Sequence, residues 1–120
     1  MNLSEDNESI ARAWIVFTLS EPDSDEYELN FWAFQKMSDL SVDDSYRALD
    51  IVETILRMNK SEKVVGMLGA GILEDMLVTR GSEIIDYLSE RAASNPDLVK
   101  ALGGAWKYRI DPIAGVKRRI

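Results

Sequence analysis

The sequence predicts an all-α fold, a compact bundle of about six or seven short helices. Three observations support this prediction. Apolar residues recur at helical spacing, helix-capping residues recur from end to end of the 120 residues, and no stretch alternates convincingly as a strand. The composition, with 46% hydrophobic and 29% charged residues, is that of an ordinary globular protein. A chain of this length can bury a core without disulfides or metals.

The first two helices are predicted from one apolar stripe and one serine cap. The first helix begins after Ser4, and its stripe consists of Ile10, Ala13, Trp14 and Phe17. Residues 20–25 form the clearest loop. Ser24 caps a second helix that is apolar around much of its circumference, at Tyr27, Leu29, Phe31, Trp32, Phe34, Met37 and Leu40. Such a helix is either central in a bundle or covered by a partner.

The third helix is predicted to start at Ser41, because Ser41 and Asp44 resemble a capping box. It runs to about Met58 and places Ala48, Ile51, Val52 and Ile55 on one face. The turn 59–61 follows, and Ser61 is the expected cap of the fourth helix.

Glycine and proline mark the remaining boundaries. Gly81 is expected to end the fourth helix, and Ser82 to cap the fifth. The Asn-Pro pair at 95–96 starts a sixth helix, which closes at the glycine pair 103–104. The Asp-Pro pair at 111–112 repeats the same start signal for a terminal helix.

The connections are short, which favours antiparallel neighbours. The third to sixth helices can therefore be read as two stacked hairpins that resemble a short helical repeat, although no internal sequence repeat is clear. We expect a single helical domain over residues 1–120, with an N-terminal helix and loop in 1–23 and the remainder in 24–120.

The chain contains no histidine and no cysteine. It therefore lacks the usual general base near neutral pH, the commonest transition-metal ligand and the thiolate nucleophile. We expect a binding protein with no catalytic residues, no cofactor and no metal. The acidic start is unlike a signal peptide, and the apolar stretches are shorter than a membrane span. A soluble, cytoplasmic protein with no membrane contact is the resulting expectation.

Charge is unevenly distributed along the chain. Residues 1–60 carry 13 acidic and 5 basic side chains, whereas residues 61–120 carry 8 and 9. An acidic half repels nucleic acid and speeds encounter with basic proteins, although net charge also simply keeps a protein soluble. The densest acidic cluster consists of Asp39, Asp43, Asp44 and Asp50. It could cover a basic active site, or it could complement a helix dipole and line a solvated face.

Three glycines, Gly66, Gly69 and Gly71, fall within the predicted fourth helix. Each costs roughly 1 kcal/mol relative to alanine in a helix interior, so three together need a reason. Close packing against a neighbouring helix is one explanation, and a helix break near Gly69 is another. Phosphate binding is disfavoured, because no phosphate-loop motif and no preceding strand are present.

Two further groups are candidates for function. Glu74 and Asp75 interrupt an apolar run, and one of them could bind Arg80 or Arg91 as a structural ion pair. Paired carboxylates also suit acid–base catalysis or a hard metal ion. Trp106 follows a Gly-Gly bend, so it is the aromatic best placed to be presented to a partner, unless it plugs the core.

From about Tyr27 to its end, the chain resembles a bacterial family known as domain of unknown function 6869. The resemblance rests on three segments: residues 48–56, the run Gly-Ala-Gly-Ile-Leu-Glu-Asp-Met-Leu at 69–77 followed by Gly81, and residues 95–106 ending in Ala-Leu-Gly-Gly-Ala-Trp. Ile72 replaces the usual proline of the family, and Leu98-Val99 stands where an aromatic residue is common. The resemblance implies a small helical protein and supplies no activity or catalytic residue.

Together these features favour a non-enzymatic bacterial protein-binding domain, most simply an immunity-type inhibitor that neutralises a toxin by covering its active site. The predicted partner is a protein with a basic surface, and the predicted contacts are the acidic cluster, Glu74, Asp75 and Trp106. One alternative is a structural or adaptor domain that forms homo-oligomers through its apolar second helix. A carboxylate- or metal-dependent enzyme is another, and nucleic-acid binding by the basic tail is disfavoured.

Overall fold

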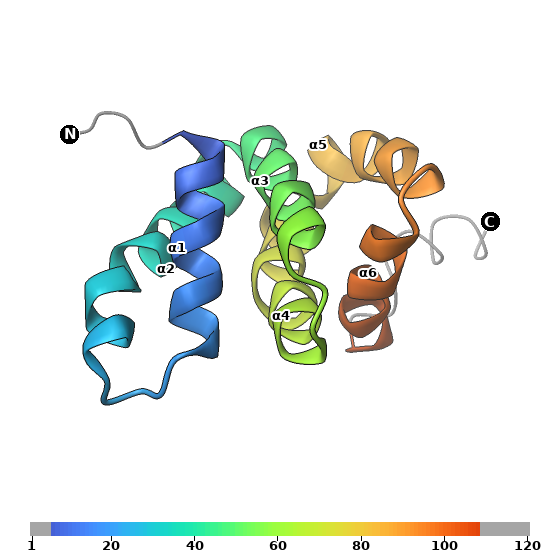
Figure 1. The fold of residues 1–120 in the computed structure, drawn as a ribbon. Coiled ribbons are helices and arrows are strands. Elements are labelled where there is room, and N and C mark those ends of the chain that lie inside the picture. Colours follow the sequence, from blue (N-terminus) through green and yellow to red (C-terminus); the bar gives the residue numbers. More distant parts are fainter. Residues whose placement is uncertain (1–5, 109–120) are drawn as a thin grey trace.

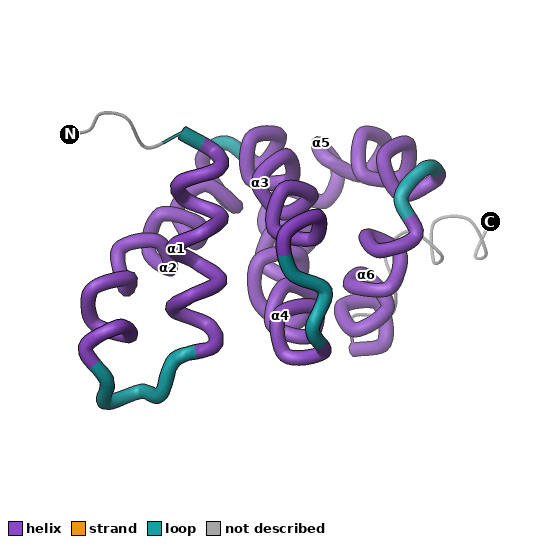
Figure 2. Tube along the Cα trace, viewed as in Figure 1, coloured by secondary structure: helices purple, strands orange, loops and turns teal. Residues whose placement is uncertain are grey.

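The structure, a computed structural model, describes residues 6–108, and for residues 104–108 it describes the backbone alone. The prediction of an all-α fold is confirmed, because the described residues form helices joined by short loops and contain no strand (Figure 2). The elements are α1 (Asn7–Leu19), α2 (Asp25–Asp43), α3 (Ser45–Met58), α4 (Glu62–Met67), the π-helical segment η1 (Leu68–Leu73), α5 (Glu74–Ala93) and α6 (Pro96–Tyr108).

The helices stand side by side in a row of antiparallel pairs (Figure 1). α1 and α2 form a hairpin at one end, and α1 also packs against α3. α3 is followed by α4, η1 and the first part of α5, which run as one continuous helix. α6 lies at the other end and packs against η1 and α5. The α2 helix therefore has neighbours on one side and solvent on the other.

Short polar side chains begin the helices largely as predicted. Ser24, Ser61 and Asn95 each accept a hydrogen bond from the backbone N–H three residues further on. Asp6 does the same for α1, which begins at Asn7; Ser4 lies outside the described residues. An ionised carboxylate is a good acceptor beside the positive end of the helix dipole.

The predicted capping box at Ser41 is wrong. Ser41 is buried inside α2, and its hydroxyl donates to the carbonyl oxygen of Ser38 at 2.7 Å, so it is not free to cap a helix. Asp44 serves both neighbouring helices instead. Its N–H donates to Leu40 O at 2.8 Å and ends α2, while its carboxylate accepts from Arg47 N–H at 3.2 Å and begins α3.

The predicted stop at Gly81 and the cap at Ser82 are also wrong, because α5 continues through both residues. The helix instead kinks at Arg80, whose φ of −131° and ψ of 23° are not helical. From this position the Arg80 guanidinium donates to the carbonyl oxygen of Val42 at 2.8 Å. A guanidinium there satisfies a carbonyl that the last turn of α2 leaves unpaired.

The glycines do not break the helices. The run that contains Gly69 and Gly71 forms the π-helical turn η1, in which the helix widens without ending. Close packing does not explain Gly66 or Gly71, because a Cβ atom at either would meet nothing within 4 Å. The predicted end of the sixth helix at residues 103–104 is wrong, since α6 extends to Tyr108. The terminal helix predicted from Asp111 lies outside the described residues.

One buried apolar cluster extends from α1 to α6. The apolar stripes predicted for the first and third helices are buried in it except for Phe17, which is buried against aromatic residues of α2, and Trp14 is only 2% exposed. Leu98, Ala101 and Leu102 bring α6 into the same cluster. No helix in the described part of the chain is both long and apolar enough to cross a membrane.

Candidate functional site

The four aspartates predicted as one acidic cluster have three different environments. Asp39 and Asp43 are exposed on α2. Asp44 is exposed as well, but its carboxylate caps α3. Asp50 is half-buried on α3 and accepts a hydrogen bond from the Tyr87 hydroxyl at 3.0 Å. Only Asp39 and Asp43 are therefore available to a partner without loss of an internal contact.

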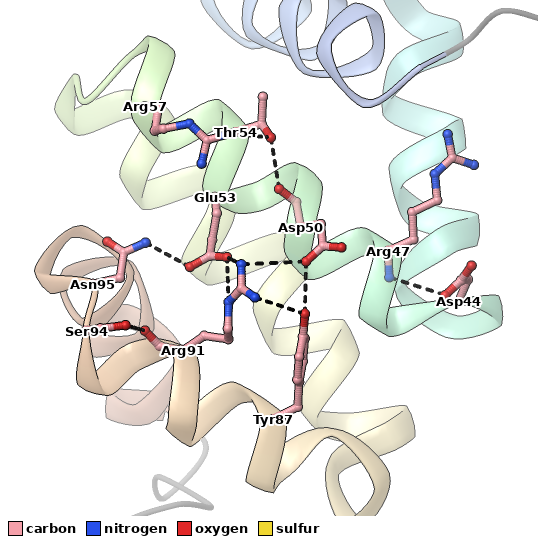
Figure 3. A network of polar contacts seen from close by, with 10 residues as sticks. All are labelled: Asp44, Arg47, Asp50, Glu53, Thr54, Arg57, Tyr87, Arg91, Ser94 and Asn95. Atoms are coloured by element: carbon pink, nitrogen blue, oxygen red, sulfur yellow. Dashed lines mark hydrogen bonds and ion pairs between the residues drawn. The ribbon is translucent and has the colours of Figure 1, made fainter.

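Asp50 belongs to a polar network that joins α3 to α5 and to the start of α6 (Figure 3). At its centre Glu53, only 6% exposed, accepts hydrogen bonds from two nitrogens of the Arg91 guanidinium, with Nε at 2.9 Å from Oε1. The other carboxylate oxygen accepts from the Asn95 side chain at 2.9 Å. The buried charge is thus paired and hydrogen-bonded on both oxygens, as a buried carboxylate requires.

Tyr87 completes the network. Its hydroxyl donates to Asp50 and accepts from Arg91 Nη1 at 3.3 Å, and the guanidinium carbon lies 5.4 Å from the centre of the Tyr87 ring. Burial, and then the hydrogen bond to Asp50, raises the pKa of Tyr87 above its ordinary value. The hydrogen bond to Glu53 raises the pKa of Arg91. Both groups therefore stay protonated, and the network acts as a clamp between α3, α5 and the start of α6.

The expectation that Arg80 or Arg91 binds Glu74 or Asp75 is wrong, because both arginines are engaged elsewhere. Arg91 binds the network, and Arg80 binds the end of α2 and lies 3.5 Å from Glu83. Burial, and then the neighbouring charge of Glu74, raises the pKa of Asp75. Among the described residues, no group of three or more side chains of the metal-ligating types is placed to hold a metal ion.

The outer side of α2 presents a mixed acidic and apolar surface, which we call the α2 face. Spacings of three, four and seven residues place its members along one stripe of the helix. They are Asp25, Glu28, Leu29, Trp32, Asp39 and Asp43, all of them exposed; the half-buried Lys36 lies on the same stripe between Trp32 and Asp39. Leu29 is 73% exposed and Trp32 is 37% exposed, which is unusual for large apolar side chains so close together. The periodicity of the sequence predicts that the second helix is apolar, but it does not show which side faces solvent. The α2 face points outward because other sides of α2 pack against the neighbouring helices.

The remaining aromatic residues of α2 lie on another side of the helix. Phe31 and Phe34 stack with ring centres 5.6 Å apart, and both contact Phe17 of α1. Tyr27 lies 4.4 Å from the Phe17 ring. This aromatic cluster closes the α1–α2 hairpin. Phe31, Trp32 and Phe34 each expose more than a third of their surface.

Trp106, the other aromatic predicted to meet a partner, lies on the backbone of α6, and its side chain is outside those described. On the α2 face, two of the predicted contacts, Asp39 and Asp43, share a helix surface with Trp32, an exposed aromatic residue.

Comparison with known proteins identifies the family. A family described as being of unknown function, DUF6869, matches residues 20–120. The chain belongs to this family. The matched region includes α2 to α6 and therefore both the α2 face and the polar network. No curated protein and no solved structure matches the chain.

Proposed function

We propose that this member of DUF6869 is a non-enzymatic bacterial protein-binding domain, an immunity-type inhibitor that neutralises a toxin by covering a basic active site. The observation that carries the proposal is the α2 face, where exposed carboxylates surround an exposed tryptophan. Interfaces of this kind combine aromatic anchors with charges that complement the partner.

The carboxylates of the α2 face are available for such contacts. Within the described residues, Asp25, Glu28 and Asp39 form no ion pair. The half of the sequence that contains them carries 13 acidic and only 5 basic residues, so the field around α2 attracts a basic protein. Charge of this kind speeds association and disfavours wrong partners.

Charge reversal tests the proposal. The tagged chain is used to capture a partner from its native host, and the captured protein is purified and assayed for a toxic enzymatic activity. Glu28→Lys, Asp39→Lys and Asp43→Lys are combined in one variant. A matched control combines Glu62→Lys, Asp86→Lys and Glu90→Lys, which are exposed on α4 and α5 and change net charge by the same amount.

We expect the wild-type chain and the control to inhibit the partner at a one-to-one ratio, and the α2 variant to lose at least tenfold in affinity, which corresponds to about 1.4 kcal/mol. A captured protein whose activity is unchanged by saturating amounts of the chain would contradict inhibition. Equal loss of affinity in both variants would show that net charge, and not the α2 face, is recognised.

A homo-oligomeric adaptor is the second candidate, because Leu29 and Trp32 could also pack against another copy of α2. Sedimentation distinguishes this function from the first. A stable oligomer that dissociates when Leu29 and Trp32 are replaced by serine would favour the adaptor.

A further inference from the structure

The first turns of α2 border an open hollow of about 380 Å³, which is lined by Asp25, Glu28 and Leu29. Two carboxylates and one apolar side chain thus meet at a single concave place. The position is the start of the α2 face, next to the loop that joins α1 to α2 (Figure 1). A side chain that fills this hollow must offer both a long apolar stem and a positive head.

We infer that the hollow binds an arginine side chain of the partner protein, a conclusion that rests on the proposed function. The methylene groups of the arginine pack on Leu29, and the guanidinium lies between the carboxylates of Asp25 and Glu28. A planar guanidinium can donate to both carboxylates at once, whereas an ammonium group acts as a point charge.

Trp32 adds a second reason for arginine. It lies four residues after Glu28 and three after Leu29, so all three side chains are neighbours on the helix surface. Its indole is partly exposed and is not engaged in any of the aromatic stacks around Phe17. An arginine stacks on an indole more readily than a lysine does.

The helix dipole alone does not account for this arrangement. Acidic residues in the first turn of a helix are stabilised by the positive end of the dipole, and Asp25 and Glu28 fit that pattern. The dipole gives no reason for a leucine that is 73% exposed beside them, or for an exposed tryptophan one turn further. Recognition of one partner side chain, through both its apolar stem and its positive head, accounts for the two carboxylates, the leucine and the tryptophan together.

Two peptides of equal length and charge test the inference on the full chain. An acetylated arginine–alanine hexapeptide and its lysine counterpart are titrated into the ¹⁵N-labelled protein at low salt, and amide shifts are followed. We expect the shifts to concentrate in residues 25–32, and the arginine peptide to bind roughly three- to fivefold more tightly, the ratio that one exposed cation–π contact provides.

Variants identify the groups responsible. Trp32→Ser should reduce the preference for arginine to less than twofold, and Leu29→Ser should weaken the binding of both peptides, while Val99→Ser, an exposed apolar residue on α6, should leave both affinities unchanged. Circular dichroism confirms that each variant is folded. Equal binding of both peptides, or shifts spread over every acidic surface, would overturn the inference.

The two proposals can fail separately. If the captured partner binds through the α2 face but the peptides show no preference, the arginine site is wrong and the inhibitor proposal stands. If the preference for arginine is present but the captured partner is not inhibited, the site stands and the proposed function is wrong.

Discussion

At the scale of single residues, the pair formed by Glu53 and Arg91 joins a buried carboxylate to a guanidinium through two hydrogen bonds. Removal of one partner leaves a buried charge without compensation, which costs about 3–5 kcal/mol when both groups are fully buried. Glu53 is buried, but the Arg91 side chain is 40% exposed. We therefore expect Arg91→Met to lower the free energy of unfolding by about 2–3 kcal/mol, measured by urea denaturation.

A double variant shows whether the lost stability comes from the unpaired charge. Replacement of both partners, Glu53→Leu with Arg91→Met, should restore the free energy of unfolding to within about 1 kcal/mol of the wild type. Arg57→Met on the exposed side of α3 serves as the control and should change stability by less than about 0.5 kcal/mol. A double variant that is less stable than Arg91→Met would show that the network contributes stability in addition to compensating the buried charge of Glu53.

Asp75 gives a pH-dependent prediction. Asp75 lies at the surface, but partial desolvation and then the neighbouring charge of Glu74 raise its pKa in the folded state. The free energy of unfolding therefore falls as pH rises from the ordinary value of 3.8 to the raised pKa, and is constant above it. We expect Asp75→Asn to stabilise the protein at pH 7, and the gain to vanish below the ordinary value of 3.8, where both states bind the proton. Asp39→Asn controls for the change in net charge. A gain that is constant from pH 3 to pH 7 would contradict this account.

At the scale of the residue, the sequence predicted correctly those features that depend on the periodicity of a single helix. The periodicity of α1 places Trp14 in the core, where the structure has it. The partners of Glu53 and Arg91 could not be predicted, because they lie 38 residues apart and meet only after α3 and α5 have packed. For the same reason Arg91 was assigned to Glu74 or Asp75, which are closer in sequence but lie on the same stretch of helix.

At the scale of the element, Gly66 offers the clearest test. It lies inside α4, and a Cβ atom added there would meet nothing within 4 Å. Alanine restricts the unfolded chain and suits a helix, so Gly66→Ala should raise the free energy of unfolding by about 0.5–1 kcal/mol. Thermal denaturation measures the change, and Gly103→Ala, equally open in α6, is a second example. Destabilisation by either substitution would show that the glycine has a role in the helix other than packing.

Three helix starts and the end of α3 at Met58 were predicted correctly from the local sequence. Ser24, Ser61 and Asn95 act through a hydrogen bond to their own helix, so local sequence identifies them. Gly81 and the glycine pair 103–104 are typical of helix ends, but in the packed structure α5 and α6 continue through these positions. The kink comes one residue before Gly81, where Arg80 turns toward Val42, a contact across 38 residues that no local pattern encodes.

At the scale of the whole molecule, packing divides the acidic residues between two tasks. Asp44 and Asp50 stabilise helices and their junctions, while Asp39 and Asp43 remain on the α2 face. Composition alone predicted an acidic partner-binding surface but could not separate these groups. The separation matters for experiment, because charge reversal at Asp44 or Asp50 would damage the fold as well as any interface.

The same division predicts the oligomeric state. A two-fold dimer through α2 would bring the carboxylates of one α2 face, among them Glu28, Asp39 and Asp43, against the carboxylates of the second copy, and like charges in contact oppose association. We therefore expect sedimentation velocity to show a 13.5 kDa monomer at both low and high salt. A dimer at low salt that dissociates at high salt would contradict this expectation, because it would require basic groups of one copy to meet the α2 face of another. Such a result would make a second copy, and not a toxin, the first partner to consider for Trp32.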